Sequence, residues 1–188
     1  MRIEIDAKTL AAVAVAQSTE TTRYYLCGVC FDGDDAVATD GHLLTVSTNV
    51  AIRHGEDAAS ILPVTSKAIT ALKRRDATHA IFDGATLSVY GATSDMVPLY
   101  LEPSAPIDGT FPDWRRVLPD VPDDACCRGM FGDSLIARIA ATAKILGAGK
   151  SLGIQFQGVD DSSAHRVRYF NGAALDTYSV AMPMRPSK

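Results

Sequence analysis

The sequence repeats one pattern three times, and this repetition constrains the fold more than any other feature. Each copy has a short apolar segment, a residue suited to cap a helix, an amphipathic helix and then several strands. The copies begin near residues 1, 60 and 126 with RIEIDAKTLAAVAVAQ, SILPVTSKAITALKRR and CCRGMFGDSLIARIAATAKIL. We expect the side chains of Asp6, Thr65 and Asp133 to cap the helices. The pattern predicts an α+β protein with helices on one face of antiparallel sheets.

After each helix, the apolar residues change to the two-residue period of β-strands. The first copy has RYYLCGVCF, AVATD and HLLTVST, the second HAIF, TLSVYG and MVPLYLEP, and the third LGIQFQG, HRVRYF and TYSVAMPM. Clusters of Asp, Gly and Ser at 32–35, 83–84 and 160–163 predict the turns between them.

Composition limits the class of protein. The chain has 188 residues, a hydrophobic fraction of 47% and a net charge of −4. No apolar run approaches the roughly 20 residues of a membrane-spanning helix, and the N-terminal MRIEIDAKTL has acids where a signal peptide is apolar. We therefore expect a cytoplasmic protein without a membrane partner.

The four cysteines do not predict a metal or redox site. Cys27 and Cys30 form a C-x-x-C motif, and Cys126 and Cys127 are adjacent. In a strand, the odd offset places Cys27 and Cys30 on opposite faces, where one zinc ion cannot easily bind both. Four reduced cysteines without a metal or other cofactor are the better interpretation.

The stretch AVATDGHLLTV places Thr39, Asp40 and His42 between two apolar runs. These residue types suit proton transfer, but Asp-Gly between alternating apolar runs is first a turn signal. An enzyme using Cys27, Cys30, Asp40 or His42 would also need a nucleophile and base brought together. The sequence indicates no such pair, so we do not expect an enzyme.

Positive charge is concentrated in the helices. The three helical segments hold no Asp or Glu between cap and end, although the chain has 22 acids and 18 bases. Such helices suit contact with the phosphates of a polyanion, without base reading; solvated lysines on an outer face are the alternative. The basic residues are Lys8, Lys67, Lys73, Arg74, Arg75, Arg138 and Lys144.

Four strings resemble segments of one known family. TRYYLCGVCF, VATDGHLLTV, FPDWRRVLP and VAMPMR occur in the same order as in the bacterial sliding clamp, the beta subunit of DNA polymerase III. Residues 1–119 resemble its middle domain, a complete clamp-like domain of two repeat units. Residues 120–188 resemble the last half of its third domain, one unit that another chain would complete. The resemblance implies the DNA-clamp fold and a non-enzymatic ring around duplex DNA that holds a polymerase on its template.

The resemblance also implies a cleft that receives short peptides from polymerases and other replication or repair proteins. Apolar walls suit Leu or Phe anchors of such a peptide. The residues carried over are Arg23, Leu26, Thr39, Gly41, His42, Leu44, Pro112, Arg116, Val117, Val180, Ala181, Met182, Pro183 and Met184. Tyr24 and Tyr25 match a segment near the DNA path.

Two departures from the family concern this cleft. Leu43 stands where the family has a basic residue, which predicts a more apolar cleft mouth. Ala181 replaces a larger aliphatic residue, which predicts a deeper pocket.

A single third unit exposes an apolar face and a sheet edge. Two chains can cover both by pairing these units. The family ring has about twelve units and this chain resembles three, which favours a homotetramer over an open dimer. The competing function is a soluble decoy or adaptor that keeps the cleft, binds clamp-binding motifs and never encircles DNA.

Overall fold

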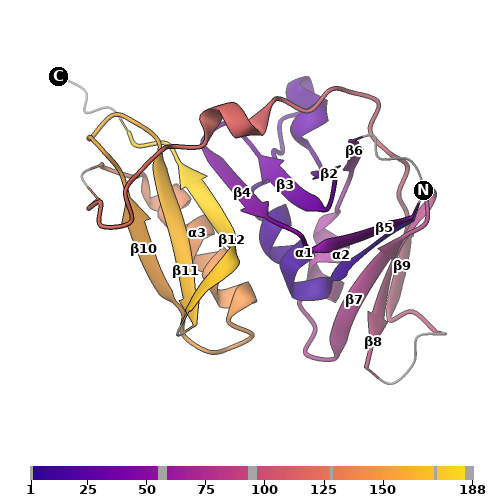
Figure 1. Cartoon of the computed structure of the whole chain (residues 1–188). Helices are drawn as coiled ribbons and strands as arrows, with labels where there is room; N and C mark the ends of the chain where they lie inside the picture. Colours follow the sequence, from indigo (N-terminus) through magenta and orange to yellow (C-terminus); the bar gives the residue numbers. More distant parts are fainter. Residues whose placement is uncertain (1, 55–58, 93–96, 128, 172, 185–188) are drawn as a thin grey trace.

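Two antiparallel sheets and a few helices form the protein, which confirms the α+β prediction (Figure 1). The computed structural model describes residues 2–54, 59–92, 97–127, 129–171 and 173–184. The five-stranded sheet has the order β5 (Ala51–His54), β1 (Arg2–Asp6), β7 (Ala77–Phe82), β8 (Thr86–Gly91) and β9 (Tyr100–Pro103). The seven-stranded sheet has the order β10 (Gly153–Gln157), β11 (His165–Asn171), β12 (Ala173–Ala181), β4 (Leu43–Ser47), β3 (Asp35–Thr39), β2 (Val29–Asp32) and β6 (Ser60–Leu62). The helices are α1 (Ala7–Ala14), α2 (Ser66–Leu72) and α3 (Asp133–Leu146), with the 3-10 helices η1 (Thr21–Leu26) and η2 (Trp114–Val117).

The first two repeat units exchange their leading strands. β1 opens the first unit but pairs with β7 of the second, and β6 opens the second unit but pairs with β2 of the first. Each unit therefore completes the other's sheet, so neither can bury its apolar face alone. α1 packs against α2, β3, β4 and β7, at the centre of this arrangement.

The third unit continues the sheet of the first. β12 pairs with β4 from Ala181 opposite Leu43 to Thr177 opposite Ser47, and α3 packs against α1. The prediction of a strand before α3 is wrong. The described residues between 120 and 132 contain no β-strand. This segment instead belongs to the irregular connection between η2 and α3, at the left of Figure 1.

Two of the three expected helix caps are confirmed. The Asp6 side chain accepts a hydrogen bond from the Thr9 amide, and the Thr65 side chain accepts one from the Ala68 amide. The expectation for Asp133 is wrong, because α3 begins at Asp133 and its N-cap is Gly132, which has no side chain to accept the bond. Asp133 instead accepts from the amide of Ser134.

The predicted strand RYYLCGVCF is only half correct. Its first part is the 3-10 helix η1, and the strand begins at Val29. Cys27 therefore caps η1 instead of alternating with Cys30 along a strand, and none of the four cysteines forms a disulfide. The Asp-Gly turns are confirmed, with φ of 95° at both Gly41 and Gly84, a conformation that favours glycine.

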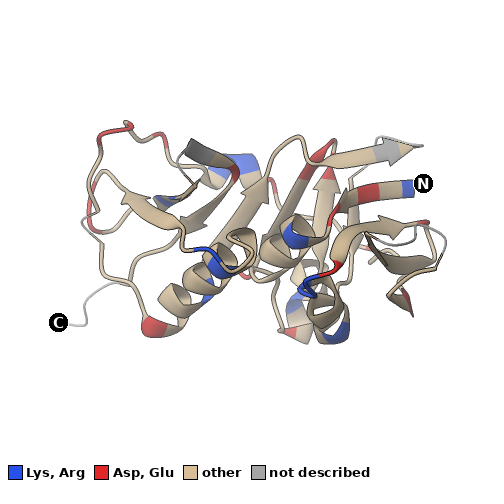
Figure 2. Cartoon of the chain, turned by 90° about the horizontal axis from the view of Figure 1, so that it is seen from below, with Lys and Arg blue, Asp and Glu red and all other residues tan. Residues whose placement is uncertain are grey.

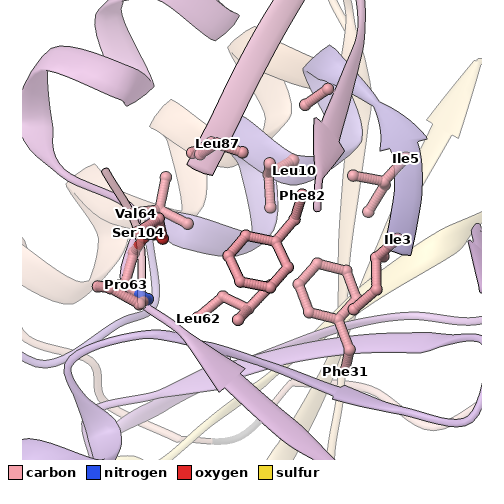
Figure 3. Close-up of a pocket in the computed structure, with 11 residues that line it drawn as sticks. Ile3, Ile5, Leu10, Phe31, Leu62, Pro63, Val64, Phe82, Leu87 and Ser104 are labelled. Atoms are coloured by element: carbon pink, nitrogen blue, oxygen red, sulfur yellow. Dashed lines mark hydrogen bonds between the residues drawn. The ribbon is translucent and has the colours of Figure 1, made fainter. Parts of the chain in front are cut away.

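The core lies between the two sheets and beneath α1 (Figure 3). It encloses a cavity of about 10 Å³, lined by Ile3 and Phe82 from one sheet, Phe31 and Leu62 from the other, and Leu10 from α1. An apolar space of this size is a packing defect and not a ligand site. In the described residues, no helix is both long and apolar enough to cross a membrane.

Replacing Leu10 by Ala tests this core. Leu10 is 2% exposed, so the substitution leaves a cavity among packed side chains and should lower the free energy of unfolding by about 2–5 kcal/mol. Leu101→Ala is the matched control, because Leu101 is 55% exposed and its loss should cost about 0.5 kcal/mol or less. Urea unfolding measures both, and equal losses would contradict this description of the core.

Candidate functional site

A cleft of about 280 Å³ lies where the β3–β4 turn, the end of β12, η1 and η2 meet. Its lining is mostly apolar, and its walls come from segments far apart in the sequence. The lining residues are Arg23, Tyr25, Leu26, Thr39, Gly41, His42, Leu44, Pro112, Asp113, Trp114, Val117, Val180 and Met182.

The register of β4 and β12 decides which side chains reach this cleft. Leu44 lies opposite Val180, and Leu43 lies opposite Ala181. Successive residues of a strand point to opposite faces, so the first pair lies on the cleft side with Trp114 and the second is buried in the main core. The amide of Met182 donates to the carbonyl oxygen of His42 at 3.0 Å, which extends the pairing to the cleft rim.

The β3–β4 turn is held by its own side chains. Asp40 Oδ1 accepts hydrogen bonds from the amides of His42 and Leu43, both at 2.9 Å. Thr39 Oγ1 donates to the Leu43 carbonyl at 2.9 Å and accepts from the Gly41 amide at 3.0 Å. These hydrogen bonds use Thr39 and Asp40 to shape the backbone, which confirms the turn predicted from Asp40-Gly41.

The opposite wall is fixed by the single tryptophan. Trp114 is 5% exposed and its Nε1 donates to Asp32 Oδ2 at 3.1 Å. Arg115 lies over the Trp114 ring at 4.2 Å and forms ion pairs with Asp32 and Asp35. η2 is thereby anchored to β2 and β3, while Val117 remains 52% exposed within the cleft.

A second groove, of about 540 Å³, lies on the helix side. Figure 2 shows basic segments along the helices on this side. Cations from all three helical regions gather here, with Lys8 from α1, Lys73 and Arg75 after α2, and Lys144 from α3. Ala141, Ile145, Ala148 and Gly149 complete the lining. Several cations in a groove with low-dielectric apolar walls create a positive potential that attracts anions.

Comparison with known proteins gives a consistent result. No protein-family model matches the sequence. The beta sliding clamp of Escherichia coli K12 is 31% identical over 157 residues, which are 79% of this chain and 40% of that protein. The beta sliding clamp of Rickettsia bellii is 31% identical over 123 residues, 61% of this chain and 31% of that protein. The chain is related to the bacterial beta sliding clamps.

Solved structures of sliding clamps have the same fold. DNA polymerase III subunit beta from Pseudomonas aeruginosa matches 99% of this chain and 66% of its own, with a TM-score of 0.67 and 17% identity. A sliding clamp from Bartonella birtlesii bound to griselimycin matches 98% of this chain and 66% of its own, with a TM-score of 0.62 and 19% identity. The resemblance and the DNA-clamp fold are thus confirmed. The chain aligns with at most 40% of the length of the two curated relatives.

The structure brings ten of the fourteen expected cleft residues together and leaves four outside the lining. Arg116 is 84% exposed at its side chain and pairs with Asp113 at 3.2 Å. Pro183 lies near Gly129, and the Met184 amide donates to the carbonyl of Met130 at 2.7 Å. Ala181 is fully buried in the core on the helix side.

The two expected departures from the family do not act on the cleft. Leu43 is fully buried in the main core, so it does not make the cleft mouth more apolar. Ala181 pairs with it and does not deepen the pocket. Tyr25, Asp113 and Trp114 line the cleft but were not among the expected residues. The available signal was the single tryptophan of the chain, which lies in a connection rich in proline and aspartate.

The remaining basic residues have different environments. Arg74 pairs with Asp76 at 2.7 Å, and Lys67 lies outside the groove lining. Lys8 Nζ donates hydrogen bonds to the carbonyls of Leu72 and Arg74. Burial lowers the pKa of this ammonium group, and the carboxylates of Asp6 and Asp76 only partly oppose the shift.

Tyr24 and Tyr25, which match a family segment near the DNA path, do not line the basic groove on the helix side. Tyr24 and Tyr25 are in η1, with their rings edge to face at 5.7 Å. Tyr25 lines the cleft and Tyr24 is 52% exposed. In the described residues, no group of three His, Cys, Asp or Glu side chains could hold a metal ion.

The carboxyl group of Asp40 makes the stability of this region depend on pH. Burial alone would raise its pKa, but hydrogen bonds from the Leu43 amide, Arg138 and the His42 amide outweigh burial and lower the pKa below 3.8. Ionised Asp40 therefore stabilises the fold above its ordinary pKa, and this contribution is lost as pH falls through the lowered value.

Asp40→Asn should cost more unfolding free energy at pH 6 than at pH 3, as measured by urea unfolding. The exposed Asp120→Asn is the control, and an Asp40→Asn cost that is the same at both pH values would contradict the assignment.

Proposed function

We propose that the protein is a DNA sliding clamp, a processivity factor that encircles duplex DNA and tethers polymerase or repair proteins through its cleft. One observation carries the proposal: the chain presents a basic groove among its helices and, separately, an apolar cleft built across the β4–β12 junction. A clamp needs one surface for DNA and another for partners, because both must be occupied together.

The helix side suits nonspecific contact with duplex DNA. Its cations come from three helical regions, and neither α1 nor α2 has an acid in its first turn. Phosphate contacts of this kind do not depend on base sequence. The chain carries a net charge of −4, so this local concentration of positive charge contrasts with the rest of its surface.

The cleft suits an extended peptide with apolar anchors. Leu26, Leu44 and Val180 form its buried floor, and Val117 and Met182 are half-exposed at its sides. Such a pocket can bury a Leu or Phe side chain, and methionine adapts to different ligands. Its partners would be DNA polymerase and other proteins carrying clamp-binding peptides.

The ring would form from several copies of the chain. Among the described residues, β10 pairs on one side only, with β11, and its Ile154 is 38% exposed. Ile136 of α3 is 40% exposed in the same unit. A second copy could cover this edge and helix face, with residues 1–119 as a complete clamp-like domain and residues 120–188 as a half domain. A homotetramer is the favoured ring, and a dimer is the alternative.

A matched pair of double variants tests the peptide cleft. Val117→Ala/Met182→Ala shortens two cleft side chains and should weaken a labelled peptide with Leu and Phe anchors by about tenfold or more. Val159→Ala/Met130→Ala removes the same atoms at exposed positions outside the lining and should leave binding unchanged. Fluorescence anisotropy gives both affinities, and griselimycin, bound by two clamp relatives, is a second probe. Equal affinity for the two variants would contradict peptide binding in this cleft.

Charge reversal tests the helix side. Lys73→Glu/Arg75→Glu/Lys144→Glu should weaken duplex DNA binding and flatten its dependence on salt, by roughly 0.9 in log–log slope for each phosphate that the variant no longer neutralises. Arg116→Glu changes an exposed arginine on the cleft side and should leave the slope unchanged. Titrations of a labelled duplex at several salt concentrations measure the slope. A triple variant that keeps the original slope would place DNA elsewhere on the molecule.

A further inference from the structure

Arg138 extends from α3 into the first unit instead of facing solvent. Its Nε and Nη2 donate to the carbonyl of Val15 at 3.2 and 2.9 Å, and its Nη1 donates to Asp40 Oδ2. The Arg138 and Asp40 side chains are only 29% and 20% exposed. The sequence placed Arg138 among the DNA-facing cations, but its guanidinium is occupied by these two partners within the chain.

The two partners of Arg138 lie at the end of α1 and in the β3–β4 turn. Val15 is the C-cap of α1, where helix carbonyls lack helical partners and a cation is favourable. Asp40 is in the β3–β4 turn, and its other oxygen holds the amides of His42 and Leu43. One side chain therefore connects α3, the end of α1 and the turn at the cleft rim.

The geometry requires the planar fork of arginine. Two of its donors reach one carbonyl while a third reaches the carboxylate. A lysine ammonium is a compact charge on a flexible stem and cannot hold both partners in the same fixed arrangement. The next hydrogen bond along the rim joins the Met182 amide to the His42 carbonyl, which carries the constraint from the turn to β12.

We propose that Arg138 is a positioning residue for peptide binding: through Asp40 it fixes the β3–β4 turn so that Gly41 and His42 form the cleft rim. This inference rests on the proposed peptide-binding function. Without Arg138 the turn keeps its local hydrogen bonds but is no longer anchored to α3. Ordering the turn then becomes a cost of binding, and affinity falls.

A double-mutant cycle tests the inference with the labelled peptide. Arg138→Gln and Asp40→Asn should each weaken binding by roughly tenfold, and the double variant should bind no more weakly than either single variant, because both act through one interaction. Arg138→Lys keeps the charge and should recover part of the affinity. Lys150→Gln, an exposed lysine after α3, should bind as the original protein does. Unfolding midpoints are measured for all variants, so that affinities are compared only between folded proteins.

Amide exchange provides a readout that does not need the peptide. Exchange of the His42 and Leu43 amides should be faster in Arg138→Gln, or in Arg138→Lys if the first variant does not fold, than in the original protein. Unchanged exchange, unchanged peptide affinity or additive effects in the double variant would each overturn the inference. If the original protein does not bind the peptide at all, the proposed function fails, and the exchange rates alone decide the role of Arg138 in the turn.

Discussion

The pairing of β12 with β4 is the interaction on which the rest of the structure depends. It joins the third unit to the first in one seven-stranded sheet and brings α3 against α1. Its register places Val180 with Leu44 on the cleft side and Ala181 with Leu43 in the core. A slip of one residue in β12 would exchange these faces, turning Val180 toward the core and Ala181 toward the cleft floor. The same pairing thus determines stability and the shape of the cleft.

The cations of the helices divide into two kinds, which their similar sequence positions conceal. Lys73, Arg75 and Lys144 line an open groove, whereas Arg138 holds a carboxylate and a helix end between two units. A charge beside a polyanion contributes through long-range attraction, which salt weakens. A partly buried charge that is hydrogen-bonded to its partner contributes through fixed geometry. The helix face and the cleft are therefore linked by a cation that belongs to neither surface.

Much of this fold follows from local patterns. Helices at apolar spacing, caps at Asp6 and Thr65, and Asp-Gly turns could be predicted because each depends on neighbouring residues. The exchange of β1 and β6 could not, because pairing partners depend on packing between distant segments. The cleft was predicted from resemblance, and one of its errors has a simple physical reason. Adjacent strand residues such as Val180 and Ala181 cannot both face one pocket, so alternation would have removed Ala181.

The measurement that tests the central claim most directly is the mass of the assembled protein in solution, by light scattering over a range of concentrations. A ring that encircles DNA predicts a mass near four chains that persists on dilution, with β10 and α3 covered by a neighbouring copy. A single chain at every concentration would contradict the ring.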